Sequence, residues 1–509
     1  MNNQEAVGEG PVTTTPGLLD AQEAIELLKT TPSTFYRWLH TGRIQGIKVG
    51  RQWRFERSAI EAFLRGEKPK AELTADPTPL ISTLEAHFVA LGVGLPILET
   101  DPVGRIVGLI LVLALRSRAT DVHLDPLRDS DQVEPRACLR FRLDGVLHER
   151  ASFDTRLLPA IIEQFKVIAN CDVLETSRPQ HGNARVQLAK PVGNEGEEES
   201  KLPPERTFVM SFLPTFYGES LTMRILGAYE AKTSLDQLDL PPEDLQKLRQ
   251  QLDTGHGLVI MSGLTGSGKT TTLLAALREV TRPGRKVMSI EDPIEMAVPG
   301  VVQVQVDQDA GLSFAAGLKA IMKSDPDVVL VGEIQDRDSL VLANQVAATG
   351  HLVLTQLHAD TAGGALRRIL DLGADPLLAS DAIRAVVAHR LVRRLCPECS
   401  VPEAPTEAQI EKVRAVAPGF AMEGLSQGFR KPHGCPLCAE TGFRGRKLLA
   451  EVLVMTPHVR SALMDGEDRE TLQTMALQGG MTPMIVQGLW RAAKGEVTLE
   501  EVLATCPTP

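Results

Sequence analysis

The stretch from Gly257 to Thr270 reads GLVIMSGLTGSGKT, and it decides the fold class of the second half of the chain. Its first part is an apolar run typical of a buried strand, and Gly263–Thr270 fits the pattern G-x-x-x-x-G-K-[ST]. Helix-prone residues follow at 271–280. This order predicts a phosphate-binding loop, because the glycines let successive N–H groups converge at the positive end of the helix.

The loop is predicted to hold ATP and Mg²⁺. Lys269 would reach the β- and γ-phosphates, and the hydroxyl of Thr270 would bind Mg²⁺. The predicted nucleotide-binding residues are Gly263, Leu264, Thr265, Gly266, Ser267, Gly268, Lys269 and Thr270. The alternative, a glycine-rich turn without a ligand, is disfavoured because a strand and a helix flank the motif in the required order.

Length and composition bound the class of protein. The 509 residues exceed one compact core and predict about three or four domains, and the 43% hydrophobic content is that of a soluble globular protein. The net charge of −11 argues against a chain coated in nucleic acid but allows a local basic patch. The longest apolar run, Ile106–Leu115, is far shorter than the roughly 20 residues that span a bilayer, so we expect a buried helix there. The N-terminus does not resemble a signal peptide, and we expect a cytoplasmic protein.

Breaks in composition predict the domain boundaries. Residues 1–16 are polar and proline-containing and predict a disordered tail, and residues 67–80 predict a linker. Residues 17–66 form a small module between them, and residues 81–238 mix helices with strands. From 239 to 509 apolar strands alternate with helical stretches, which predicts an α/β fold with a parallel sheet.

Carboxylates follow two further apolar strands of this last domain. The strand DVVLVGE (327–333) ends in Glu333, which could hold the Mg²⁺ shell or orient the attacking water. The stretch SIEDPIE (289–295) places Glu291 and Glu295 after another strand, where the carboxyl ends of parallel strands gather ligands. A solvated turn is the alternative for this second cluster.

The motifs, taken in order, resemble those of the type II secretion and type IV pilus assembly ATPases. The Walker A motif, Asp box, Walker B motif and His box are in turn GLTGSGKT (263–270), IEDPIE (290–295), DPDVVLVGEI (325–334) and TGHLVLTQLH (349–358). The middle region agrees through ATDVHLDP (119–126), FRLDG (141–145) and LPTFYGE (213–219). The resemblance covers residues 81–505, and the ordered set is specific.

The resemblance implies a homohexameric motor at the cytoplasmic face of the inner membrane. Such a motor uses ATP hydrolysis and Mg²⁺ to drive pseudopilin or pilin assembly through an inner-membrane platform protein. It implies a RecA-like P-loop ATPase core preceded by an α+β middle domain. The implied catalytic residues are Glu291, Glu295, Glu333 and Arg224, and the implied phosphate-sensing residues are His351 and His358. For either histidine a structural role is the alternative.

The chain departs from the family's pattern where arginines are usual. The residues at these positions are Gln335, Met210, Ser220, Lys319 and Lys323. Neither Lys nor Met reproduces the planar fork with which arginine stabilises transition-state charge. We therefore expect hydrolysis to be slow or to depend on Arg224 and on neighbouring subunits. The rival interpretation is a DNA-binding regulator with a nucleotide-gated ATPase switch.

Two cysteine pairs predict a metal site within residues 390–450. The pairs Cys396-Pro-Glu-Cys399 and Cys435-Pro-Leu-Cys438 supply four thiolates, the usual set for a closed tetrahedral Zn²⁺ site. Such a site has no open position, so the Zn²⁺ would be structural. Free thiols or a redox pair are the alternatives.

The module at 17–66 resembles an excisionase-type winged helix-turn-helix. Leu18–Leu28 predicts a capped helix, Thr31–Leu39 a turn and a second helix, and residues 42–55 a two-stranded wing. Six basic residues and one acidic residue lie between Arg37 and Arg57, a concentration that phosphate contacts need. The predicted DNA-binding residues are Ser33, Thr34, Arg37, Arg51 and Arg54. The alternative is a protein-docking module for a membrane partner.

Overall fold

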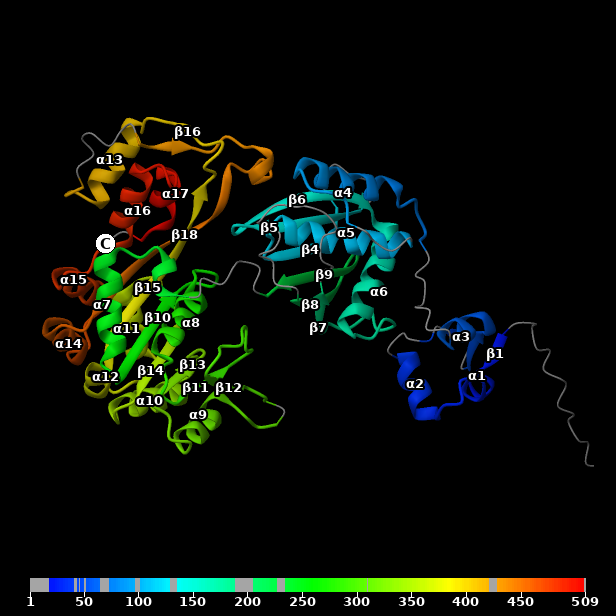
Figure 1. The fold of residues 1–509 in the computed structure, drawn as a ribbon, viewed down its shortest axis with the longest axis horizontal. Coiled ribbons are helices and arrows are strands. Elements are labelled where there is room, and N and C mark those ends of the chain that lie inside the picture. Colours follow the sequence, from blue (N-terminus) through cyan, green and yellow to red (C-terminus); the bar gives the residue numbers. More distant parts are fainter. Residues whose placement is uncertain are drawn as a thin grey trace, which may run out of the picture. The chain divides into compact units, whose positions relative to one another are not determined.

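The structure is a computed structural model. It describes residues 18–40, 44, 46–49, 52–64, 73–96, 101–128, 135–187, 205–226, 234–308, 310–420 and 428–507. The chain divides into two compact units, Met1–Ala228 and Tyr229–Pro509, each with its own cores (Figure 1). The predicted tail at 1–16 lies outside the described residues, as does the first part of the predicted linker. The second part is already helical from Thr78 onward.

The N-terminal module combines a small sheet with three helices. Its elements are β1 (Leu18–Asp20), α1 (Ala21–Leu27), α2 (Pro32–His40), β2 (Ile47–Val49), β3 (Gln52–Glu56) and α3 (Arg57–Leu64). The strands are antiparallel in the order β1-β3-β2. Phe35 and Phe55 are fully buried, and their rings pack edge to face with centroids 5.1 Å apart. The helix α2 is thereby fastened to the sheet.

The first helix of this module begins at Ala21, three residues after the predicted start at Leu18. Leu18–Asp20 forms a strand because it pairs with β3, a contact that no local pattern announces. Asp20 then caps α1: its carboxylate accepts from the N–H of Glu23, and the Glu23 side chain accepts from the N–H of Asp20. The described strands of the predicted wing are Ile47–Val49 and Gln52–Glu56, while Gly42 and Arg43 lie outside the described residues.

The rest of the first unit is an antiparallel sheet packed against helices. Its elements are α4 (Thr78–Ala90), α5 (Pro102–Arg116), β4 (Asp121–Leu127), β5 (Arg136–Leu143), β6 (Val146–Asp154), α6 (Leu158–Ala169), β7 (Gln180–Gln187), β8 (Glu205–Thr215) and β9 (Gly218–Ile225). The strand order is β6-β5-β4-β9-β8-β7, and all three helices share one core with the sheet. The apolar run at 106–115 is buried in α5, as predicted. Within the described residues, no helix is both long enough and apolar enough to cross a membrane.

The second unit is built on a seven-stranded sheet. Its first elements are α7 (Pro242–Asp253), β10 (Gly257–Gly263), α8 (Lys269–Val280), β11 (Val287–Glu291), β12 (Val301–Gln305), α9 (Phe314–Met322), β13 (Val328–Val331), α10 (Arg337–Ala348), β14 (Leu352–Leu357), α11 (Ala362–Asp371) and α12 (Pro376–Ala382). The remaining elements are β15 (Ile383–Leu395), β16 (Val401–Pro402), α13 (Glu407–Val416), β17 (Arg430–Lys431), β18 (Phe443–Val454), α14 (Pro457–Met464), α15 (Arg469–Gln478), α16 (Met484–Ala493) and α17 (Leu499–Thr505). The predicted alternation of strands and helices is confirmed.

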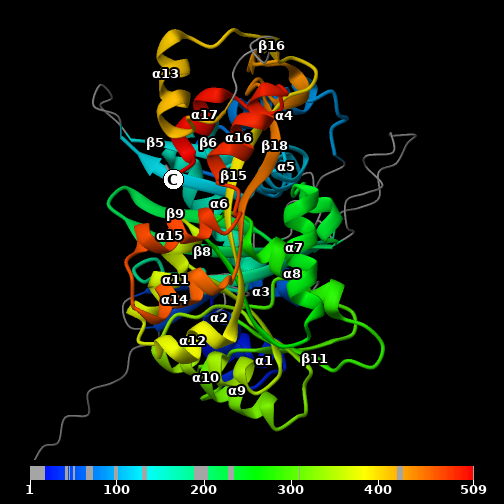
Figure 2. The same ribbon diagram turned by 90° about the vertical axis from the view of Figure 1, so that its left-hand side faces the viewer.

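Sheet order determines where the functional residues meet. The order is β12-β11-β13-β14-β10-β15-β18, and every neighbouring pair is parallel except β15 and β18. Figure 2 shows α7 and α8 on one side of this sheet and α11, α14 and α15 on the other, in agreement with two separate cores. Since parallel strands end at the same edge, the residues that follow β10, β14, β13 and β11 form one row.

Candidate functional site

The phosphate loop lies between β10 and α8, where the sequence predicts it. β10 ends at Gly263 and α8 begins at Lys269. Gly266 and Gly268 have φ angles of 75° and 98°, a region that side chains disfavour. A Cβ at Gly263 would lie 2.8 Å from the carbonyl oxygen of His389, so this position also requires glycine.

Lys269, His358 and Glu333 form a connected set at the edge of the sheet. Nζ of Lys269 lies 3.4 Å from Nδ1 of His358, and Nε2 of the same ring lies 2.7 Å from Oε1 of Glu333. One neutral tautomer satisfies both contacts, since Nε2–H donates to the carboxylate while Nδ1 accepts from the ammonium. The histidine therefore joins the lysine of the phosphate loop to the carboxylate that follows β13.

The surroundings of Lys269 modify its charge and hold its side chain. Burial lowers the pKa of Lys269, and the nearby carboxylate of Glu333 partly offsets this effect. The ammonium also donates to the carbonyl oxygens of Gly263 and Leu264, at 2.8 and 3.1 Å. These contacts keep Nζ over the mouth of the loop, where a nucleotide phosphate would bind.

Gln335 acts on the same carboxylate from the other side. Its amide Nε2 donates to Oε2 of Glu333 at 2.9 Å, so both carboxylate oxygens have a hydrogen-bond partner. The sequence identified Gln335 only as a missing arginine. In the structure the uncharged amide of Gln335 donates a hydrogen bond to Glu333, where an arginine could form an ion pair with it.

Glu291 is held firmly but lies farther along the row. It is the last residue of β11 and is buried, and its Oε1 accepts from Ser289 Oγ at 2.6 Å and from Gln303 Nε2 at 2.9 Å. Three strand spacings, or about 14 Å, separate β11 from β10, whereas β14 is the neighbour of β10. His358 and Glu333 are therefore closer to the phosphate loop in the sheet than Glu291 is.

Gln303, which is not among the predicted site residues, orders the Asp box. Besides contacting Glu291, its amide donates to the carbonyl of Met296 at 3.0 Å and accepts from the N–H of Val298 at 2.7 Å. It belongs to β12, whose sequence VVQVQ looks like any half-exposed strand. Glu295, on the segment that Gln303 supports, is exposed to solvent. No signal in the sequence distinguishes Gln303 from a surface glutamine.

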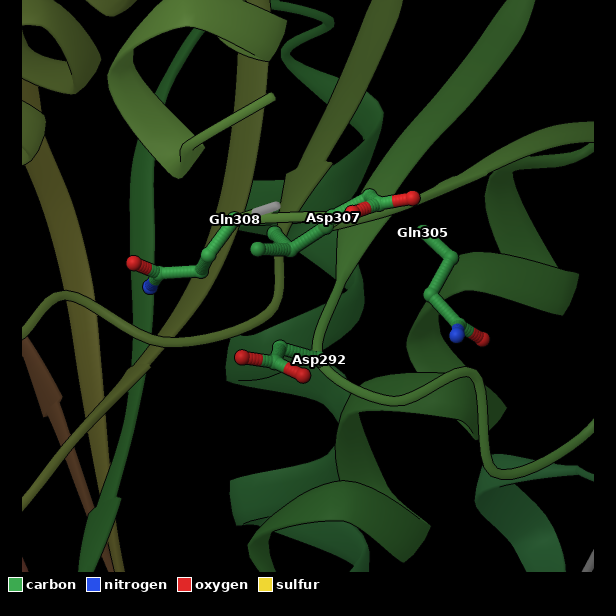
Figure 3. A pocket seen from close by; sticks show the side chains of 5 residues that line it. Asp292, Gln305, Asp307 and Gln308 are labelled. Atoms are coloured by element: carbon green, nitrogen blue, oxygen red, sulfur yellow. The ribbon is translucent and has the colours of Figure 1, made fainter. Parts of the chain in front are cut away.

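A hollow of about 390 Å³ lies beside the Asp box (Figure 3). It is lined by Asp292, Gln305, Val306, Asp307 and Gln308. Two carboxylates and two amides without a basic group disfavour phosphate binding. The phosphate loop thus remains the better site for the phosphates of a nucleotide.

The two histidines of the predicted His box lie at opposite ends of β14. His358 follows the strand, whereas His351 precedes it and lies beside the amino end of β10, where its carbonyl accepts from the N–H of Gly257 at 2.9 Å. Seven residues of extended chain correspond to about 23 Å. The Nδ1 of His351 lies 3.2 Å from Thr349 Oγ1 and from the carbonyl oxygen of Val346. The structure therefore does not bring His351 to the phosphate loop, and its geometry fits the structural alternative.

The arginine position of the first unit has an acidic partner. Arg224 lies on β9, and its Nε donates to Oδ1 of Asp121 on β4 at 3.0 Å. Met210 is fully buried in the core of this unit, and Ser220 is buried as well. An arginine at position 210 would place a charge in apolar surroundings, so methionine suits the packing there.

The four predicted metal ligands come together. Their Sγ atoms all lie within 4.8 Å of one another, with 3.8 Å between Cys396 and Cys435, 3.8 Å between Cys399 and Cys438, and 3.6 Å between Cys435 and Cys438. A tetrahedron of Zn–S bonds of about 2.3 Å has edges of about 3.8 Å. A disulfide would need about 2.05 Å. The donor set and its spacing fit Zn²⁺.

Backbone donors support these sulfur atoms. The N–H of Gly434 points to Sγ of Cys399 at 3.3 Å, and the N–H groups of Cys435 and Gly442 point to Sγ of Cys438, each at 3.2 Å. Such contacts stabilise thiolates, the form that binds metal.

The predicted DNA-binding residues are only partly described. Ser33 and Thr34 lie in the first turn of α2, where Oγ1 of Thr31 lies 3.1 Å from Ser33 Oγ and donates to Thr34 Oγ1 at 2.9 Å. Arg54 lies on β3 and donates to Oε1 of Gln52 at 2.8 Å. Arg51 and the side chain of Arg37 lie outside the described residues.

Comparison with known families decides the relationship. The family model "Type II/IV secretion system protein" matches residues 98–504. The chain belongs to this family. A second model, "Helix-turn-helix domain", matches residues 18–68. As a member of the Type II/IV secretion system protein family, the chain thus carries an N-terminal helix-turn-helix in addition to its ATPase core, and the resemblance stated from the motifs is confirmed.

Individual relatives span most of the chain. It is 35% identical over 456 residues to the type II secretion system protein E of Pectobacterium carotovorum, covering 88% of this chain and 85% of the relative. It is 32% identical over 448 residues to the type IV pilus assembly ATPase PilB of Myxococcus xanthus, covering 88% and 75%. The structure of the Legionella pneumophila ATPase DotB is similar with a TM-score of 0.55 and 17% identity, covering 80% of this chain and 96% of that one. At this identity the last comparison establishes the fold, which is the predicted RecA-like α/β fold.

Proposed function

We propose that this chain is the ATP-hydrolysing motor of a type II secretion or type IV pilus system. The observation that carries the proposal is the connection from Lys269 through His358 to Glu333 at the edge of a RecA-like sheet. It joins the group that would bind phosphate to the group that would orient water. The relatives named as type II secretion protein E and PilB ATPase support the same conclusion.

The roles of the residues follow from their places in the row. The N–H groups of 264–270 and the ammonium of Lys269 would bind the phosphates, and Glu333 would hold and orient the attacking water. Mg²⁺, bound by the hydroxyl of Thr270 with help from the carboxylates, would neutralise charge on the phosphates. His358 donates to the carboxylate of Glu333 and would respond to a phosphate bound at Lys269. Glu291 and Glu295 would act from farther along the row.

The oligomer and its partners belong to the same proposal. We infer a homohexamer that acts with an inner-membrane platform protein at the cytoplasmic face of the membrane. Arg224 would then serve the nucleotide from the first unit and exchange Asp121 for a phosphate. The arginines missing at Gln335, Met210 and Ser220 suggest slow turnover unless neighbouring subunits supply charge.

Isothermal titration with ATP and a steady-state hydrolysis assay test this function. We expect the full chain to bind ATP and to hydrolyse it in a manner that EDTA abolishes, because the phosphate charge needs Mg²⁺. Hydrolysis that grows more than linearly with chain concentration would support catalysis by an oligomer. Absence of ATP binding in the calorimeter would refute the motor proposal.

The second candidate function is a DNA-binding regulator with a nucleotide-gated switch. The helix-turn-helix match at 18–68 and the neutral Gln335 beside Glu333 favour it. A switch would bind ATP and barely turn it over, whereas a motor hydrolyses steadily. Turnover per bound nucleotide therefore separates the two functions.

DNA binding by the N-terminal module makes its own prediction. If α2 enters the major groove and the β2–β3 hairpin lies on the backbone, affinity falls steeply as salt rises. Replacing Arg51 and Arg54 together by Ala should weaken binding to all sequences alike, while Ser33→Ala or Thr34→Ala should change which sequence is preferred. Fluorescence anisotropy of the full chain at two salt concentrations checks this. Salt-insensitive or undetectable binding would favour the protein-docking alternative.

A further inference from the structure

The loop between β14 and α11 carries His358, so whatever holds this loop also places the ring between Lys269 and Glu333. On one side Ser262, in the strand that leads into the phosphate loop, donates its hydroxyl to the carbonyl of Ala359 at 2.8 Å. On the other side the loop enters the first turn of α11, where backbone N–H groups have no partner within the helix. Thr361 Oγ1 accepts from the N–H of Gly364 at 3.0 Å, whereas the partners of Ala362 and Gly363 come from the last part of the chain.

Two buried side chains accept these N–H groups. The N–H of Ala362 donates to Oε2 of Glu451 at 3.1 Å, and the N–H of Gly363 donates to Oε1 of Gln473 at 2.8 Å. Glu451 is 2% exposed on β18, and Gln473 is 7% exposed on α15. We call these two acceptors the C-terminal latch. They lie 89 and 110 residues beyond their donors in sequence.

The helix α15 makes further contacts with the same loop. Arg469 donates to Oδ2 of Asp360 at 3.0 Å, two residues after His358. A Cβ at Gly363 would lie 2.6 Å from the backbone nitrogen of Gln473, so the two helices touch through their backbones at this point. Any shift of α15 must therefore move the start of α11.

The latch also connects to α16, and the carboxylate of Glu451 sets the direction of the helices that it contacts as well as their separation. Oε1 of Glu451 accepts from the N–H of Met484 at 3.4 Å, so one carboxylate joins the first turns of α11 and α16. Burial raises the pKa of Glu451, and the N–H of Ala362 partly offsets this effect. An apolar side chain could fill the space but could not accept these N–H groups, so the carboxylate defines the direction in which each helix starts.

We propose that Glu451 and Gln473 are positioning residues of the nucleotide site, which fix His358, and through it Glu333, and make hydrolysis depend on the placement of the C-terminal helices α15 and α16. The inference rests on the proposed ATPase function. The connection is continuous and short. The latch holds the first turn of α11, the chain from there back to His358 is only a few residues long, and His358 contacts Glu333. A force on the C-terminal helices would reach the water-orienting carboxylate along this path.

The variant Gln473→Met in the full chain tests the latch. Methionine has a similar length but no strong acceptor for the N–H of Gly363, so packing is largely kept while the hydrogen bond is lost. We expect kcat to fall by about tenfold through misplacement of His358, while KM for ATP stays within about twofold because the phosphate loop is untouched. Amide hydrogen exchange at residues 358–364 should become faster. Gln478→Met, at an exposed position of the same helix, is the matched control and should change neither quantity.

The outcomes separate the latch from the proposed function. A folded Gln473→Met chain with unchanged kcat, or with a raised KM and unchanged kcat, overturns the latch. If this variant does not fold, Arg469→Met replaces it, because the ion pair between Arg469 and Asp360 is half-exposed and its loss should be tolerated. We then expect kcat to fall by about threefold. An unchanged kcat in this variant overturns the proposal. If the unaltered chain hydrolyses no ATP, the proposed function fails, and the exchange rates at 358–364 alone decide whether the latch holds this loop.

Discussion

Glu333→Gln is expected to stop turnover while leaving ATP bound. The amide keeps the shape of the side chain but loses the negative charge that would orient water and the Mg²⁺ shell. General acid–base and charge effects of this kind contribute on the order of 10²- to 10⁴-fold, so kcat should fall by about that factor. ATP affinity should change little, because the groups that would bind phosphate are Lys269 and the loop N–H groups. Steady-state kinetics and calorimetry on the same preparation measure both effects.

The local network makes the expected pattern sharper. Oε1 of Glu333 accepts from His358 and Oε2 from Gln335, so the glutamine variant can keep one acceptor but must turn its NH₂ group towards one of these donors. His358→Ala should therefore reproduce part of the loss in kcat. Glu411→Gln, an exposed position on α13, serves as the control and should retain wild-type turnover. Equal losses of ATP affinity and kcat in Glu333→Gln would contradict the assigned role.

Lys269 and Glu333 could be predicted from the sequence because each belongs to a motif that is contiguous in the chain. Gly263–Thr270 turns from strand to helix within eight residues, and Glu333 comes two residues after β13 ends. The His box was harder, because its two histidines are seven residues apart on one strand. A strand advances about 3.3 Å per residue, so a motif that is compact in sequence can extend across the whole sheet. His351 enters the prediction only through the resemblance to the family's His box, and the structure places it before β14, whereas His358 follows this strand.

The supporting residues could not be predicted, because each acts on a segment far away in the chain. Gln303 orders the Asp box from the neighbouring strand, and Gln473 reaches the N–H of a residue 110 positions earlier. Glu451 left one usable signal: a single carboxylate within the apolar strand LLAEVLV. A charge there must either face solvent or find a buried partner, and only the tertiary structure identifies Ala362 and Met484. The strand at Leu18–Asp20 was missed for the same reason, since its pairing with β3 is non-local.

Loss of the predicted Zn²⁺ is expected to unfold the excursion between β15 and β18 while the nucleotide site survives. The four cysteines lie within this excursion, residues 396–442, beyond the paired residues Leu395 and Phe443 of the two strands. Structural Zn²⁺ contributes about 10–16 kcal/mol of binding free energy in isolated zinc-finger peptides. Its removal should therefore cost more folding free energy than the loss of most single contacts. The phosphate loop follows β10, and none of its residues belongs to the cysteine cluster, so its structure should survive the loss of Zn²⁺.

Cys438→Ser tests this expectation most directly, because Sγ of Cys438 accepts from two backbone N–H groups as well as facing three other sulfurs. We expect about one zinc per chain in the unaltered protein and none in the variant, with rapid hydrogen exchange and proteolysis confined to 396–442. Cys506→Ser is the matched control: burial raises the pKa of Cys506 to about 12, so its thiol stays protonated and it lies outside the cluster. Elemental analysis without chelator, followed by ATP calorimetry, reads both parts of the prediction. Metal-free unaltered protein, or a Cys438→Ser chain that keeps its zinc, would exclude the Cys₄ site, whereas lost ATP binding in the variant would show that the excursion supports the phosphate loop after all.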